Sequence, residues 1–156
     1  MNVFLNYDTG VFSAALIQMQ TQLKITVEQI SYMNSIVYIG LCVASLFGSF
    51  LFQKISANYL ISFMVILNAV ACYLFVMTSN ILHLYLIRFV LGFTQAFVVI
   101  HGPVWVNEFS PQESSSRWLA MLHGAVVVGI LGGYLITAIF ENYFSGYCDW
   151  RTSITI

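Results

Sequence analysis

Arg88 and Asp8 are the two charged residues that lie well inside apolar segments of this chain of 156 residues. Arg88 stands seven residues after Ile81, in an apolar run about as long as a bilayer is thick. A charge at such depth is costly and normally faces a protein interior or a water-filled cavity, so it marks a candidate functional site. Asp8 lies in the first apolar run, in the sequence Asn-Tyr-Asp-Thr-Gly.

Helix geometry places these two side chains at similar depths. The first helix is expected to leave the membrane near Gln20, at the face where the fourth helix enters near Asn80. At a rise of about 1.5 Å per residue, Asp8 then lies roughly 18 Å and Arg88 roughly 12 Å from that face. A carboxylate beside an arginine ionises more readily, and loss of the arginine raises its affinity for a proton. The pair is therefore either a proton switch or an inert ion pair. If the N-terminus is free, Asp8 is instead exposed to water rather than buried.

The other polar residues form no enzyme or metal motif. His83, His101 and His123 are not three or four residues apart, so they do not make a helical metal site. His83 and His123 are expected to be structural, whereas His101 precedes Gly102-Pro103 and could satisfy backbone groups that the proline frees. Glu108 and Arg117 flank the loop after the fourth apolar run, where a solvated pair contributes little. There is no Ser/His/Asp order, no HExxH and no P-loop. The sequence predicts that the chain is not an enzyme and has no cofactor and no metal.

The composition is that of a membrane protein. Hydrophobic residues make up 60% of the chain and charged residues 7%, whereas soluble domains carry about 25% charged residues. The net charge is −1 with no basic or acidic block, which gives no case for nucleic acid. Cys42 and Cys72 lie in apolar runs and are expected to act as small buried hydrophobes. The N-terminus has no basic region followed by a cleavage site, so no removable signal peptide is expected.

Five apolar runs are long enough to cross a membrane. About 20 residues span the hydrocarbon core of roughly 30 Å as a helix. Helices are expected because every backbone polar group in lipid must be satisfied internally. The predicted fold is an all-α membrane protein occupying residues 1–156, with successive helices antiparallel. The expected helices cover about residues 1–20, 33–52, 59–77, 81–106 and 118–140, with the start of a sixth after 149.

Positive charges do not orient the helices. Lys54 and Arg117 fall on one side of the membrane, and Lys24 and Arg151 fall on the other. The positive-inside rule requires an excess of Lys and Arg on the cytoplasmic side. Two residues against two give no orientation.

Small residues recur on two of the runs. Gly40, Ala44 and Gly48 are four apart and share one face, which is the small-xxx-small pattern of closely packed helices. The fifth run carries a less regular set, Ala120, Gly124, Gly129, Gly132 and Gly133. Both sets predict tight helix packing. The alternative is that these faces move against a partner bundle.

The motifs, taken in order, resemble the major facilitator superfamily and the sugar porters within it. They are Asp8-Thr-Gly-Val in the first helix, Arg88-x-x-x-Gly92 in the fourth, Pro103-Val-Trp-x-x-Glu108-x-x-Pro111 with Arg117 after it, Val126-Val-Val-Gly-Ile-Leu in the fifth, and Asp149-Trp-Arg before a sixth. The loop after the second helix, Gln53-Lys-Ile-Ser-Ala-Asn, keeps one cation of the family's Asp-Arg-x-Gly-Arg-Arg motif. Gln95-Ala and Asn6-Tyr are similar to the spinster-like transporters, which are the second resemblance.

The resemblance implies a partial N-terminal six-helix bundle of a twelve-helix transporter, which binds solute near the midplane between two halves. It implies a cytoplasmic N-terminus, an absent inner part of the first helix and a chain that stops as the sixth begins. Seven residues match positions with family roles: Asp8 and Arg88 in proton coupling, His123 and Gln95 along the substrate pathway, and Lys54, Glu108 and Arg117 in cytoplasmic gating.

The expected function is transport of a small polar solute, sugar-like, by alternating access with proton symport through Asp8 and Arg88. The expected partners are the solute, the lipid bilayer, protons and a missing C-terminal bundle; the sequence does not indicate which membrane. Two alternatives remain open. One is a lipid or organic-anion carrier of the same superfamily, and the other is a truncated, non-transporting membrane protein that pairs through the Gly40/Ala44/Gly48 face.

Overall fold

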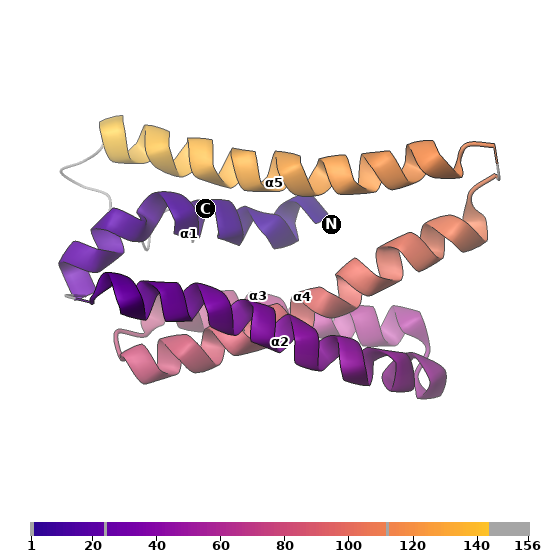
Figure 1. Ribbon diagram of the computed structural model, residues 1–156, viewed down its shortest axis with the longest axis horizontal. Coiled ribbons are helices and arrows are strands. Elements are labelled where there is room, and N and C mark those ends of the chain that lie inside the picture. The colour runs from indigo at the N-terminus through magenta and orange to yellow at the C-terminus, as the bar shows by residue number, and fades with distance from the viewer. Residues whose placement is uncertain (1, 24, 112, 144–156) are drawn as a thin grey trace. The chain divides into compact units, whose positions relative to one another are not determined.

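The structure, a computed structural model, describes residues 2–23, 25–111 and 113–143. These residues form five helices, drawn in Figure 1: α1 Asn2–Leu23, α2 Val27–Lys54, α3 Ala57–Met77, α4 Ile81–Phe109 and α5 Ser115–Tyr143. No strand occurs in the described ranges, and the predicted all-α fold is confirmed. The start of a sixth helix after 149, together with Lys24, Cys148 and Arg151, lies outside the described residues.

Four of the five helices in the described ranges are long and apolar enough to cross a membrane, namely α2, α3, α4 and α5. The 22 residues of α1 extend about 33 Å at 1.5 Å per residue, which is long enough. However, α1 is not among the four, since Asn2, Asn6 and Asp8 make its first two turns polar. All five predicted membrane-crossing segments therefore form helices that are long enough to cross. Only four of these helices are also apolar enough.

A capping box starts α2 at Val27, earlier than the apolar pattern predicted. The Thr26 amide donates to Gln29 Oε1 at 3.0 Å, and the Gln29 amide donates to Thr26 Oγ1 at 3.3 Å. These reciprocal bonds satisfy amides that have no partner in the first turn of a helix. Residues 27–32 therefore form the first turns of α2.

The chain divides into two compact units. The first contains Met1–Ile30 and Ala120–Ile156, and so holds α1 and most of α5. The second contains Ser31–Leu119, and so holds most of α2 and all of α3 and α4.

In the first unit, glycines bring α1 and α5 together, and the two helices run side by side (Figure 1). A side chain added at Gly133 would meet the backbone of Tyr7, and one at Gly129 would meet the backbone of Val3. Gly10 lies against the backbone of α5 in the same way. Because Val3 faces Gly129 and Tyr7 faces Gly133, the two helices are parallel.

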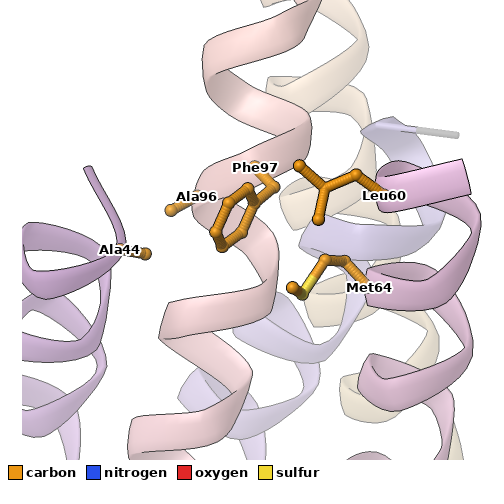
Figure 2. Packing of buried hydrophobic residues seen from close by; sticks show 5 residues of the cluster. All are labelled: Ala44, Leu60, Met64, Ala96 and Phe97. Atoms are coloured by element: carbon orange, nitrogen blue, oxygen red, sulfur yellow. The ribbon is translucent and has the colours of Figure 1, made fainter. Parts of the chain in front are cut away.

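In the second unit, α4 lies between α2 and α3. Figure 2 shows Phe97 with Leu60 and Met64 of α3 on one side and Ala44 of α2 on the other. Residues Thr78–Asn80 join α3 to α4 in a short, antiparallel connection. One row of α3 is buried, formed by Leu60, Met64, Asn68, Ala71 and Phe75. Their spacing of three and four residues is typical of a helix face packed on a core.

Two glycines let the backbones of α2 and α4 approach each other. A side chain added at Gly40 would meet the carbonyl of Phe89, and one at Gly92 would lie 2.9 Å from the Cα of Val37. Ala44, one turn after Gly40, is fully buried. The predicted packing of the Gly40/Ala44/Gly48 face is confirmed, and its partner is α4 of the same chain. That face is therefore already occupied, which removes the pairing route of the non-transporting alternative.

The small residues of α5 divide between two sides of the helix. Gly129 and Gly133 contact α1. A side chain added at Gly124 or Gly132 would have no neighbour within 4 Å among the described residues. The prediction of tight packing therefore holds for only part of this set.

Candidate functional site

Arg88 is buried in the second unit, with 4% of its surface exposed. It projects from α4 toward α3, where its Cζ lies 4.6 Å from the centroid of the Phe75 ring. The negative face of an aromatic ring attracts a cation, and the attraction grows when water is excluded. Arg88 thus faces a protein interior, as expected for a charge within an apolar helix, and Phe75 forms one wall of its site.

The same α3–α4 interface holds a buried polar contact. The Asn68 side-chain amide donates to Thr94 Oγ1 at 2.9 Å. The Thr94 hydroxyl is in turn 3.0 Å from the carbonyl oxygens of Val90 and Leu91. The Cys72 thiol lies 4.0 Å from Asn68 Oδ1. Buried amides need such partners because an unpaired polar group in an apolar setting is costly.

Sequence reasoning missed both Phe75 and this polar contact. The signal for the contact was Asn68 itself, an amide in the middle of an otherwise apolar segment of α3. No comparable signal marked Phe75, since α3 also carries Phe63 and the chain has 13 phenylalanines.

Asp8 lies on α1 and is half-buried. The hydroxyl of Thr9 is 3.4 Å from its Oδ1. Asp8 belongs to the first unit and Arg88 to the second, so their pairing remains a prediction.

The two predicted substrate-pathway residues also belong to different units. Gln95 is half-buried on α4, next to Thr94, and belongs to the second unit. His123 is exposed on α5 and belongs to the first. Their shared role remains a prediction.

Lys54, predicted to act in gating, is the last residue of α2 and is exposed. Its Nζ lies 4.4 Å from the centroid of the Phe50 ring, one turn earlier. The ammonium group therefore makes a cation–π contact with this ring, in an exposed setting where such a contact is weak. The positive charge at this end also suits the negative end of the helix dipole.

The two other predicted gating residues flank the loop between α4 and α5. Glu108, in the last turn of α4, and Arg117, in the first turn of α5, are both exposed. No ion pair joins these two described residues. Ser115 instead donates to Asn107 Oδ1 across the loop at 3.5 Å. This agrees with a solvated loop, and a role in gating remains a prediction.

An aromatic row on α4 faces α2 and ends at His101. Phe89, Phe93, Phe97 and His101 are four residues apart, with ring centroids 6.5 Å apart for the first pair and 5.4 Å for the second. Phe52 of α2 lies 5.9 Å from Phe97 and 5.7 Å from His101, stacked on the latter at 18°. His101 thus packs against Phe52 of α2.

Comparison with known proteins identifies the family. A family model described as the Major Facilitator Superfamily matches residues 1–156. The chain belongs to this superfamily. It is 29% identical over 145 residues to solute carrier family 2, facilitated glucose transporter member 12, of Xenopus laevis, covering 93% of this chain and 25% of that protein. The human protein of the same name is 24% identical, covering 93% of this chain and 24% of that protein.

A plant relative extends the likeness to the whole chain. The protein named Probable polyol transporter 6 of Arabidopsis thaliana is 25% identical over 156 residues, covering 100% of this chain and 31% of that protein. The chain thus spans about a quarter to a third of the length of the curated relatives it matches. No solved structure matches.

Family membership and the four apolar helices make this an integral, multi-pass membrane protein. It is a transporter-family chain and not an enzyme. Its relatives carry sugar and polyol transporter names, so the sugar-porter resemblance predicted from the sequence is confirmed.

Proposed function

We propose that the full-length protein carries a small polar solute of the sugar or polyol class across a membrane. The observation that supports this most directly is similarity over at least 93% of the chain to proteins named as glucose and polyol transporters. The family match over residues 1–156 supports the same class of function.

The mechanism we propose is alternating access. The bundle to which these helices belong rocks against a second bundle around a site near the membrane midplane. His123 and Gln95 contribute polar contacts to the solute, while Lys54, Glu108 and Arg117 act at the cytoplasmic side.

Proton coupling is assigned to Asp8 and Arg88. Arg88 is held in a buried site, where its charge interacts strongly with any nearby carboxylate. An adjacent cation lowers the pKa of a carboxyl group, and separation of the two raises it. Protonation of Asp8 therefore weakens its attraction to Arg88, and the movement that separates them favours proton uptake. This links proton binding to one orientation of the carrier.

The test is uptake of labelled glucose and sorbitol into liposomes containing the full-length protein, with and without an inward proton gradient. The wild-type protein is expected to transport faster with the gradient, whereas Asp8→Asn loses that dependence. Glu28→Gln is the matched control, because it neutralises an exposed carboxylate on α2. It is expected to keep the proton dependence.

The outcomes separate the parts of the proposal. Unchanged proton dependence in Asp8→Asn would remove Asp8 from coupling while leaving transport intact. Uptake of an organic anion or a lipid in place of sugars and polyols would favour the other carriers of the superfamily. No uptake of any of these would favour a non-transporting protein.

A further inference from the structure

A polar stripe runs along α2 on a side that no other helix of its unit covers. It consists of Ser31, Ser35, Tyr38, Cys42, Ser45 and Ser49, all exposed. The spacing alternates between four and three residues. At about 100° per residue these positions occupy about 80° of the helix circumference.

The rest of α2 is divided into two apolar sectors. Gly40, Ala44 and Gly48 are buried and face α4. Ile39 and Phe47 are exposed and apolar, with Phe47 55% exposed. The sector around Phe47 has the character expected of a surface in lipid, since the hydrocarbon core favours such side chains. The polar stripe contrasts with it on the same helix and therefore faces something other than lipid.

The stripe offers uncharged hydrogen-bonding groups. The Ser35 hydroxyl donates to the Ser31 carbonyl at 3.0 Å, and the Ser45 hydroxyl donates to the Cys42 carbonyl at 2.7 Å. Because each proton is used within the helix, each hydroxyl oxygen is left as an acceptor. The phenol of Tyr38, a residue 68% exposed, can donate as well as accept. Acceptors and a donor without charge suit a neutral solute with many hydroxyl groups.

We propose that this polar stripe lines the water-filled solute path and contacts the hydroxyl groups of a sugar or polyol. The inference rests on the proposed function and deepens it, because it adds α2 to the solute-binding surface. The two pathway residues predicted from the sequence, Gln95 and His123, lie on α4 and α5.

A helix packed permanently on the stripe is the other occupant that this spacing allows. The close helix contacts inside this protein argue against it. They are made at glycines, as at Gly40, Gly92 and Gly133, whereas the stripe carries the bulky side chain of Tyr38 near its middle. Such a surface keeps a neighbouring backbone at a distance and leaves room for water.

Cys42 lies in the middle of the stripe and is exposed, so the burial predicted for it from the sequence is wrong. Its thiol can therefore be used as a chemical probe of what surrounds the stripe. A charged, membrane-impermeant methanethiosulfonate reacts with a thiolate, which forms in water and is suppressed in an apolar environment. The experiment measures the modification rate of the full-length protein in liposomes, and the difference between wild type and Cys42→Ser gives the rate at Cys42. The control combines Cys42→Ser with Phe47→Cys, which places the thiol about 140° around the helix from Cys42, in the exposed apolar sector.

Cys42 is expected to react at least about tenfold faster than the thiol of the Phe47→Cys control, because only the former meets water. Glucose or sorbitol at about nine times its half-saturating concentration is expected to slow the reaction at Cys42 about tenfold, as occupancy by solute leaves about a tenth of the sites open.

A Cys42 that reacts no faster than the control thiol would show a stripe facing lipid or a packed helix, and would overturn the inference. Fast modification that neither solute slows would overturn the solute contact. Uptake by the unlabelled protein is measured in the same liposomes. Absence of uptake counts against the proposed transport, while an unreactive Cys42 in a transporting protein counts against the stripe alone.

Discussion

Asn68 of α3 donates a hydrogen bond of 2.9 Å to Thr94 of α4, in a buried position between two helices that are otherwise apolar. Seven residues after Asn68, Phe75 lies against Arg88, with 4.6 Å from ring centroid to Cζ. The two contacts lie at different heights on one interface. A shift of either helix by one residue would disturb both, so together they fix the register in which Arg88 is presented.

The Asn68–Thr94 bond is expected to contribute measurably to stability. Asn68→Leu and Thr94→Val should each lower the free energy of unfolding by about 0.6–1.7 kcal/mol, the range for hydrogen bonds between membrane helices. The double variant should lose less than the sum, since both changes remove the same bond. Unfolding in mixed micelles measures these values. Asn58→Leu, at an exposed site on α3, is the control, and strictly additive losses would contradict the coupling.

Phe75 is expected to stabilise the charge of Arg88. A double-mutant cycle of Phe75→Leu and Arg88→Met should give a coupling energy of about 1–2 kcal/mol, because a desolvated cation–π contact has that magnitude. Phe75→Tyr keeps the aromatic face and should preserve most of the stability. Phe63→Leu changes an exposed phenylalanine of the same helix and should have little effect. A coupling energy near zero would show that Phe75 only fills space.

The helices could be predicted where a local signal coincided with the apolar pattern. The start of α4 at Ile81 is such a case, because Asn80 caps it by accepting a bond from the Leu82 amide at 3.0 Å. The start of α2 was missed because Thr26 and Gln29 are polar residues in a polar stretch. Apolar periodicity cannot distinguish a capped polar turn from a loop, whereas the capping-box spacing can.

Residue partners were less predictable than residue environments. The cost of a charge in lipid predicted that Arg88 faces an interior, but not that Phe75 would lie against it, since α3 contains two phenylalanines. The spacing of Gly40 and Ala44 predicted close packing. It could not predict which helix would pack there, because small residues allow any helix to approach. The first answer depends on how α3 and α4 fold back on each other, and the second depends on how α2 packs against α4.

The Thr26 cap is expected to hold the first turn of α2. Thr26→Ala should cost about 1 kcal/mol, the usual loss for an N-cap side chain, and should speed hydrogen exchange at the Gln29 amide. Thr26→Ser keeps the hydroxyl and should retain most of the protection. Equal exchange in the alanine and wild-type proteins would show that the reciprocal bonds do not hold this turn.

The glycine contact between α2 and α4 gives the sharpest test of the packing. Gly92→Ala would place a methyl group 2.9 Å from the Cα of Val37 and against the carbonyl of that residue. Backbone cannot move aside as a flexible side chain can. The two helices must separate, at a cost of about 1–3 kcal/mol, typical of overpacking. Unfolding in mixed micelles should show this loss.

Gly124→Ala and Gly132→Ala are the matched controls within a membrane helix. An added methyl group has no neighbour within 4 Å at either site among the described residues, so only helix propensity changes. Alanine is favoured over glycine by up to about 1 kcal/mol in a helix. These variants should be neutral or slightly more stable. A Gly92→Ala protein as stable as these two would contradict the close approach of α2 and α4, and a marked loss in Gly124→Ala or Gly132→Ala alone would instead place a packed neighbour on that side of α5.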